Sequence, residues 1–242
     1  MRIQMFVASS LVCCEAQCLI EEDILEKFLQ KQEFAKPHIG TDEAGKGDYF
    51  GPLVVAGVFV DNEVGGSLRK EGVVDSKQLS DSQIGLLAKS IKRGCIFDVV
   101  VVSPKRYNQL HAKMGNINLL LAWAHARVIE NLLGKAECGV VLSDQFGEEH
   151  FLEEKLMEKG QKVDLIQRPR AEEDVAVAAA SILARDEYLK RKKKLSEKHG
   201  VDLPGGSGKR VVETGKLLTK LYGRGILPDV AKVHFKTTAQ IL

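Results

Sequence analysis

The sequence predicts an α/β domain with a mixed central sheet flanked by helices, followed by C-terminal helices. Short apolar runs rich in Val and Ile, typical of buried strands, alternate with segments that carry helix-start and helix-stop signals. The chain has 242 residues, of which 44% are hydrophobic and 28% are charged. This composition suits a globular domain with a sizeable core, and it excludes collagen-like, coiled-coil and wholly disordered chains.

The first half of the domain is expected to contain three strands and one helix. Residues 52–60 are rich in Val and predict a buried strand, whereas residues 61–75 contain adjacent glycines and are expected to form a loop. Ser80 and Gln83 match a capping box, which opens a helix that reaches about residue 93. The other expected strands span residues 38–45, including an exit turn, and residues 95–102.

Helices and strands alternate in the second half. Ser103 followed by Pro104 predicts a helix to about residue 114, and a longer helix is expected from Asn116 or Asn118 to residue 133, where Gly134 stops it. Strands are expected at 138–143 and 162–167, and helices at 148–159 and 172–198. The 172–198 helix begins with small residues and should pack closely on the sheet. A turn at 203–208 and one or two helices complete the chain.

Several features bear on the compartment. The longest apolar runs, residues 52–60 and 118–123, are far shorter than the roughly 18 residues of a membrane span. The first 18 residues faintly resemble a signal peptide, but a first strand or a poorly chosen start site is the favoured interpretation. The five cysteines are odd in number, and the cluster of Cys13, Cys14 and Cys18 lacks metal-site partners, so we expect a reducing compartment, the cytoplasm.

The segment from Gly40 to Gly47 resembles a phosphate-binding P-loop, yet it does not qualify as one. Position 47 is Gly instead of the Ser or Thr that holds a metal ion in a P-loop. Asp42 and Glu43 would also place negative charge against phosphates. We therefore expect no P-loop here.

The same segment predicts a metal site. Asp42 and Glu43 end one expected strand and Asp144 ends another, so their carboxylates are expected to meet at one edge of the sheet. Clustered carboxylates are tolerated where they bind hard cations such as Mg²⁺ or Mn²⁺. Glu172, Glu173 or Asp174 supplies a fourth candidate. The competing interpretation is that Asp42 is a turn residue and Asp144 a helix N-cap.

A turn of small residues follows the first two acids. Gly45 and Gly47 flank Lys46, so the backbone can approach a ligand closely and offer its N–H groups. Backbone without bulky side chains, next to metal ligands, is suited to binding a sugar–phosphate substrate.

With these residues in view, the sequence resembles the ribonuclease HIII family, a bacterial branch of the type 2 ribonucleases H. The longest match is Asp42-Glu43-Ala44-Gly45-Lys46-Gly47-Asp48-Tyr49-Phe50-Gly51-Pro52, where related type 2 enzymes carry Gly-Arg-Gly instead of Gly45-Lys46-Gly47. Further matches are Asp75-Ser76-Lys77-Gln78-Leu79-Ser80, the segment 116–122, the segment 177–185 and Ala231-Lys232-Val233-His234-Phe235-Lys236-Thr237. The resemblance covers residues from about 37 to the end.

The resemblance implies a ribonuclease H-like fold and endonucleolytic cleavage of the RNA strand of RNA–DNA hybrids. It implies a two-metal-ion mechanism with Mg²⁺ or Mn²⁺ that leaves 5′-phosphate and 3′-hydroxyl ends. The implied metal ligands are Asp42, Glu43 and Asp144. For the fourth acid, Asp174 and Glu172 rank above Glu173, without a choice between them.

The resemblance also implies substrate-binding positions. The backbone of Gly45, Lys46 and Gly47 is expected to sense the 2′-hydroxyl that distinguishes RNA from DNA. Other candidates are Ser76, Lys77, Asn118 and Ser207. The basic run 190–194 is either a solvated helix end or a surface that follows phosphates. His125 is expected to be a core or surface histidine.

The sequence departs from the family pattern at its N-terminus. Ribonuclease HIII proteins usually carry a hybrid-binding domain of about 80 residues there, whereas only about 36 residues precede the catalytic motif. We therefore expect residues 1–36 to be a short segment, with that domain truncated or absent, and residues 37–242 to be the catalytic domain. A monomer without membrane association is expected.

The net charge of +2 is the sum of a basic C-terminal region and an acidic remainder. From Arg185 to the end there are 14 Lys and Arg against 6 Asp and Glu, a charge of +8, which leaves −6 for the preceding residues. An acid-bearing body joined to a basic region suits a protein that binds both metal ions and a polyanion. Two alternatives stay open: a catalytically inactive hybrid-binding module, and another nuclease of the same superfold, such as a junction resolvase.

Overall fold

The computed structural model describes residues 36–145, 147 and 150–242. Only the unit Pro37–Leu242 is considered below. The cysteine cluster and the faint signal-peptide pattern lie outside the described residues. Within them, no helix is long and apolar enough to cross a membrane.

A five-stranded mixed sheet forms the centre of this unit, in the order β3-β2-β1-β4-β5. The strands are β1 His38–Ala44, β2 Leu53–Val60, β3 Ile96–Val102, β4 Val140–Asp144 and β5 Asp164–Arg168. β1, β2 and β3 form an antiparallel meander, whereas β4 pairs in parallel with both β1 and β5. Parallel pairing follows because helices separate these strands in the sequence, as expected.

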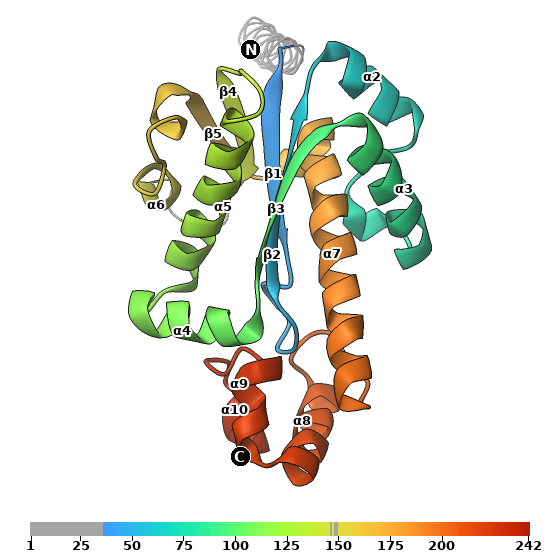
Figure 1. Ribbon diagram of the computed structural model, residues 1–242, viewed down its shortest axis with the longest axis vertical. Helices are drawn as coiled ribbons and strands as arrows, with labels where there is room; N and C mark the ends of the chain where they lie inside the picture. The colour runs from blue at the N-terminus through green and yellow to red at the C-terminus, as the bar shows by residue number, and fades with distance from the viewer. Residues whose placement is uncertain (1–35, 146, 148–149) are drawn as a thin grey trace, which may run out of the picture. The chain divides into compact units, whose positions relative to one another are not determined.

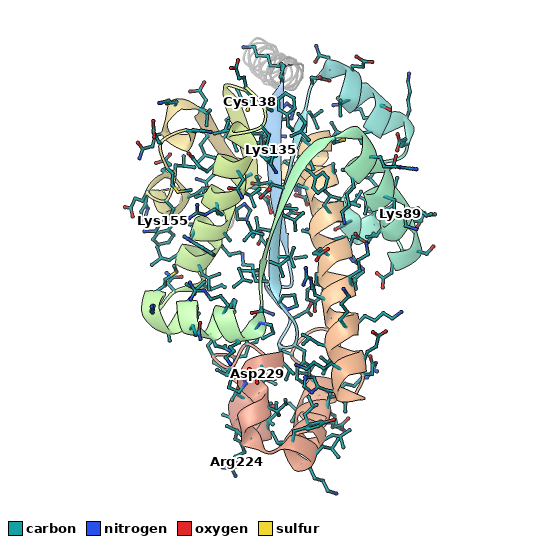
Figure 2. All side chains as sticks on the ribbon, in the orientation of Figure 1. Lys89, Lys135, Cys138, Lys155, Arg224 and Asp229 are labelled. Atoms are coloured by element: carbon teal, nitrogen blue, oxygen red, sulfur yellow. The ribbon has the colours of Figure 1, made fainter. Side chains whose placement is uncertain are left out.

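Helices cover both faces of the sheet, as Figure 1 shows in a view along its edge. One face carries α2 Asn62–Lys70, α3 Asp81–Gly94 and α7 Val175–His199, and the other carries α5 Ile117–Leu133 and α6 His150–Glu153. Alternate residues of β2 divide between the two cores: Val54 and Val58 pack with α7 and α3, whereas Val55 packs with α5. Side chains fill the space between sheet and helices on both sides (Figure 2).

The first half of α7 lies unusually close to the sheet. Its residues from Val175 to Ala184 are buried, and most of them are small. A Cβ atom on Gly40 of β1 would lie 2.3 Å from the backbone of Ala176 and Val177. The small residues therefore let the helix backbone approach the strand, which confirms the packing predicted for this helix.

The C-terminal helices form the lower part of the molecule in Figure 1, beyond the β1–β2 loop. They are α8 Lys209–Tyr222, α9 Leu227–Val230 and α10 Thr237–Ile241, and α4 Pro104–Met114 contacts α9. A bridge between Phe50 and Ala231 joins them to the β1–β2 loop. Tyr49 and Phe50 are buried among their apolar side chains.

Two elements differ from the sequence prediction. Residues 61–75 were expected to be a loop, but Asp61 caps α2 by accepting from the Val64 amide at 2.9 Å. The helix expected at 148–159 is helical only at His150–Glu153 among the described residues. Beyond it, the Glu130 carboxylate accepts hydrogen bonds from the amides of Lys159 and Gly160, which holds a tight turn in place of a continued helix.

Candidate active site

Strand register brings the predicted acids together. β1 and β4 pair in parallel up to Thr41 opposite Ser143, so Asp42 and Asp144 are the next residues along the two strands. The charge of Asp144 is one of the causes that, after burial, raise the pKa of Asp42, so the two carboxylates lie close enough to interact. The predicted convergence of strand ends is therefore present.

Asp42 lies on the face of β1 that packs against α7. Burial, reinforced by the charges of Glu43 and Asp144, raises the pKa of Asp42 to about 8. Hydrogen bonds from Ser181 and from the Glu43 amide, the latter at 2.7 Å, act in the opposite direction. Asp42 is thus a carboxylate whose negative charge is poorly compensated by the protein alone.

Glu43 lies on the opposite face of β1, toward α5. Although burial opposes it, the hydrogen bond and charge of His125 and the charge of Lys46 hold the pKa of Glu43 below its usual value. His125 Nε2 is 3.3 Å from Glu43 Oε2, and Lys46 Nζ is 3.4 Å from Oε1. Both oxygens of Glu43 therefore have a cationic or hydrogen-bonding neighbour.

Glu172 lies beside Asp144, in the 3₁₀ turn Ala171–Glu173 that precedes α7. Its charge is one of the causes that, after burial, raise the pKa of Asp144. Lys77 Nζ is 3.7 Å from Glu172 Oε1. Partial burial opposes it, but Asp75, Glu172, Asp42 and Asp144 together raise the pKa of Lys77. The Lys77 ammonium therefore faces the same acidic group.

Asp174 has a different environment. It is buried at the N-terminus of α7, where Oδ1 accepts from the amides of Ala176 and Val177 at 2.8 and 3.2 Å and lies 3.0 Å from His38 Nε2. Although burial opposes it, His38 and these amides hold the pKa of Asp174 below its usual value. Asp174 is thus engaged as a helix cap, whereas Glu173 is exposed.

The glycine turn follows directly. Gly45 has φ +84°, and a Cβ there would lie 2.5 Å from the Pro52 carbonyl oxygen and 2.8 Å from the Tyr188 ring. A Cβ at Gly47 would meet nothing within 4 Å, so its backbone is open to an approaching molecule. Gly206 accepts a hydrogen bond from the Tyr49 amide at 2.9 Å, which places Ser207 beside the chain that leaves this turn.

Of the remaining residues predicted to bind substrate, Asn118 lies near Asp144 and Ser76 lies in the interior. The Asn118 side chain lies against Gly147, in the segment that follows Asp144. Ser76 is buried, and its hydroxyl lies 2.6 Å from that of Ser181. Ser76 therefore lies behind Asp42, as a support for Ser181, and does not face solvent where a substrate would bind.

Sequence reasoning missed the role of His125. The ring is fully buried, with Nδ1 3.0 Å from Thr41 Oγ1 in addition to the Glu43 contact. A signal was present, because His125 follows Asn118 by seven residues, or two helical turns, and so shares its helix face. Ser181 was likewise recorded only as part of a motif, although it hydrogen-bonds Asp42.

The acids fit a metal ion by their chemistry and not by their present spacing. Among the described residues, no group of three or more His, Cys, Asp and Glu side chains is close enough to coordinate one. The donor chemistry nevertheless fits a hard divalent cation, because Asp42, Glu43, Asp144 and Glu172 offer only carboxylate oxygens. The raised pKa values of Asp42 and Asp144 indicate negative charge that a cation would stabilise.

Comparison with known proteins places this geometry in a family. The model of the family described as Ribonuclease HII matches residues 39–238. Ribonuclease HIII of Chlamydia pneumoniae is 44% identical over 227 residues, which cover 92% of this chain and 76% of that protein. Ribonuclease HIII of Protochlamydia amoebophila strain UWE25 is 42% identical, covering 92% of this chain and 75% of that protein.

Solved structures agree with the sequence matches. The crystal structure of Bst-RNase HIII in complex with Mn²⁺ has a TM-score of 0.79 at 33% identity, covering 86% of this chain and 69% of that chain. The ribonuclease H-like fold expected from the resemblance is therefore confirmed. The chain belongs to the ribonuclease HII family, in which it matches the ribonuclease HIII proteins, and it is a ribonuclease H-type hydrolase.

Proposed function

We propose that this chain is a metal-dependent endonuclease that hydrolyses the RNA strand of RNA–DNA hybrids. The observation that carries the proposal is the juxtaposition of Asp42, Glu43 and Asp144 with the open backbone at Gly47. Family membership supports the same substrate class. Acids that hold metal ions, placed beside backbone that can approach a sugar, are what cleavage of a ribonucleotide linkage requires.

The metal ligands in this proposal are Asp42, Glu43, Asp144 and Glu172. Glu172 is preferred to Asp174 because Asp174 is engaged by the N-terminus of α7 and by His38, whereas Glu172 lies beside Asp144. Mg²⁺ and Mn²⁺ both suit an all-carboxylate set. When bound, a pair of such cations supplies the positive charge that stabilises the attacking and leaving oxygens of the phosphodiester.

The protein's own groups orient the reactants. Glu43 is held by His125, and Asp42 by Ser181 and the Glu43 amide. The Lys77 ammonium, 73% exposed, faces the carboxylates and is available to a phosphate oxygen.

Recognition of RNA is assigned to the turn Gly45, Lys46 and Gly47. The proposal is that its N–H groups contact the 2′-hydroxyl, which DNA lacks. Ser207 and Asn118 lie at the edges of the same site, near Tyr49 and Gly147 respectively. Ser76 acts through Ser181 and is not proposed to contact substrate.

The proposal also covers the cleavage products, the catalytic domain, the oligomeric state and the location of the protein. Cleavage leaves 5′-phosphate and 3′-hydroxyl ends by the two-metal-ion mechanism. Residues 37–242 act as the catalytic domain. The protein works as a monomer in the cytoplasm.

Product mapping tests this function. The full chain is incubated, with Mg²⁺ or Mn²⁺ and separately with EDTA, with three end-labelled duplexes of one sequence: a uniform RNA–DNA hybrid, a DNA duplex with one ribonucleotide, and all-DNA. We expect cleavage of the uniform hybrid at several positions, 5′-phosphate and 3′-hydroxyl ends, and an uncut all-DNA duplex. The duplex with a single ribonucleotide reports how many ribonucleotides the glycine turn needs.

Two results would overturn the proposal. Binding of the hybrid without cleavage at any metal concentration would identify a hybrid-binding module. Cleavage of branched DNA in preference to the hybrid would identify a resolvase-type nuclease.

A further inference from the structure

His125 joins two residues of the strand that carries the first acids. It lies in the middle of α5 and has no solvent exposure. Nδ1 is 3.0 Å from Thr41 Oγ1, and Nε2 is 3.3 Å from Glu43 Oε2. The contact with Glu43 is the longer of the two but remains within hydrogen-bonding distance.

Strand geometry explains why one ring reaches both residues. Successive side chains of a strand point to opposite faces, so Thr41 and Glu43 share a face while Asp42 points to the other. α5 covers the face of Thr41 and Glu43, and Asp42 instead contacts Ser181 of α7. The two acids of the motif are therefore supported from opposite layers of the fold.

Hydrogen-bond chemistry assigns the direction of the Glu43 contact. An ionised carboxylate only accepts, so His125 Nε2–H donates to Glu43 Oε2. The Thr41 hydroxyl can donate or accept and therefore pairs with Nδ1 whichever proton that nitrogen carries. Both ring nitrogens are then satisfied, and rotation of the buried ring would break both contacts.

The result is a constraint on Glu43. Its Oε2 is fixed by His125, and its Oε1 is the oxygen that lies 3.4 Å from Lys46 at the open side of the site. A free glutamate side chain has several rotamers, and ordering it costs free energy whenever it binds a ligand. A neighbour that orders it beforehand removes that cost from the binding step.

We propose that His125 is a positioning residue that pre-orders Glu43 for metal binding. The proposal rests on the proposed function, in which Glu43 is a metal ligand. Partners that orient a ligand in this way are typically worth about 10–100-fold in metal affinity. A histidine that only filled the core would contribute to stability and not to metal affinity.

The experiment compares three substitutions in the full chain. His125→Leu removes the donor, His125→Gln keeps an N–H near the position of Nε2, and Val128→Ala removes buried volume from the same helix without touching Glu43. Mn²⁺ affinity is measured by isothermal titration calorimetry without nucleic acid, and folding by thermal unfolding. The Mn²⁺ concentration that half-saturates hybrid cleavage is measured in parallel.

The expected result separates positioning from packing. His125→Leu weakens Mn²⁺ affinity and raises the half-saturating concentration by about 10–100-fold, with cleavage largely restored at high Mn²⁺. His125→Gln stays within about 3-fold of the native chain, and Val128→Ala lowers thermal stability without changing affinity. Wild-type Mn²⁺ affinity in His125→Leu would overturn the inference.

Two further variants keep the test decisive. If His125→Leu does not fold, Thr41→Val replaces it, because loss of the second ring contact should weaken Mn²⁺ affinity several-fold; an unchanged affinity would contradict the proposal. Glu43→Gln separates this inference from the proposed function. If Glu43→Gln leaves Mn²⁺ affinity unchanged, the ligand assignment itself fails, whereas a loss in Glu43→Gln but not in His125→Leu refutes only the role of His125.

Discussion

Asp42 and Glu43 are neighbours in sequence whose carboxylates have opposite pKa shifts. Burial and neighbouring acids raise the pKa of Asp42, whereas His125 and Lys46 lower that of Glu43 against the effect of burial. The difference arises because adjacent strand residues face different layers. The surroundings therefore favour the anionic form of Glu43 and the neutral form of Asp42.

The fourth acid provides a prediction at the level of single residues. Glu172→Ala removes a carboxylate beside Asp144, so we expect hybrid cleavage to fall by about 100-fold or more with little change in stability. Asp174→Ala removes the α7 cap and the partner of His38, so the free energy of unfolding should fall by about 1–2 kcal/mol. Cleavage rates and urea unfolding of both variants distinguish the two roles.

The opposite pattern would reverse the assignment. An inactive but fully stable Asp174→Ala, together with an active Glu172→Ala, would make Asp174 the ligand.

The sequence predicted the acids better than their supports. The positions of Asp42 and Asp144 near the ends of their strands were predictable, because the end of a buried strand is visible as a transition from apolar to acidic residues. His125 lies within an apolar helical segment, where only its shared helix face with Asn118 pointed to the site, and its contact with Glu43 depends on how α5 is rotated against the sheet. Ser76 belongs to a recognisable motif, but only the structure shows that its hydroxyl is buried against Ser181.

Among the elements, the loop between β1 and β2 depends on a buried lysine. Lys232 is fully buried, and its Nζ donates to the carbonyl oxygens of Asp48 and Gly51 at 2.7 and 2.9 Å. Burial lowers the pKa of Lys232 to about 7, with Asp48 opposing and Lys192 reinforcing the shift. This contact attaches the chain that follows the glycine turn to the C-terminal helices.

The shift of Lys232 predicts a pH-dependent stability. Between about pH 7 and 10.5, Lys232 is protonated in the unfolded chain but has lost its proton in the folded chain. Because the unfolded chain binds the extra proton, the contribution of Lys232 to the free energy of unfolding increases as pH rises through this window. Lys232→Met should lower the free energy of unfolding by about 1–3 kcal/mol at pH 7, because two buried carbonyls lose their donor. The difference in free energy of unfolding between the native chain and Lys232→Met, called the deficit below, should grow by roughly 2 kcal/mol between pH 7 and 9.

Urea unfolding at both pH values measures this deficit. Lys236→Met, an exposed position in the same segment, is the control and should show no such change. A deficit that is constant or that shrinks with rising pH would contradict the assignment.

Most elements were predictable, and the exceptions have physical causes. The capping box of Ser80 and Gln83 and the cap of Asn116 are local interactions, and both helices begin where those residues indicate. α2 was missed because Gly65 and Gly66 suggest a loop, while its stability comes from packing: Gly65 is buried and Leu68 joins the core. α6 was expected to reach residue 159 but ends at Glu153, and further along the chain the amides of Lys159 and Gly160 donate to Glu130, a contact distant in sequence that no local pattern predicts.

At the scale of the whole molecule, charge is divided between two regions. The chain from Arg185 onward carries +8 and the rest −6. A groove of about 810 Å³ beside α7 is lined by four basic side chains and three acidic ones: Lys190, Lys192, Lys193, Arg210, Asp81, Asp186 and Asp202. A Cβ on Gly205 would lie 3.3 Å from the Asp48 carboxylate, which belongs to the loop after the glycine turn. Basic side chains of α7 and α8 therefore contribute to this groove.

This division predicts how hybrid binding responds to salt. Each phosphate contact that is lost should reduce the slope of log Kd against log salt by about 0.7–0.9. The double substitution Lys193→Gln and Arg210→Gln should thus reduce the slope by about 1.5 and weaken binding uniformly across sequences. Fluorescence anisotropy with labelled hybrid at several salt concentrations measures the slope.

The double substitution Lys70→Gln and Lys162→Gln is the matched control, because it also removes two charges, from exposed lysines that do not line the groove. An equal change in both proteins would show that only total charge matters and that the groove has no special role.

The central claim is that carboxylates at the ends of β1 and β4 bind divalent metal to cleave hybrids. Asp42→Asn tests it most directly, because it removes one ligand while preserving size. The native chain should cut a uniform hybrid in Mn²⁺ and stop in EDTA, and Asp42→Asn should bind the hybrid with similar affinity yet cut it at least about 1000-fold more slowly. Cleavage by Asp42→Asn at the native rate, or by the native chain in EDTA, would contradict the account.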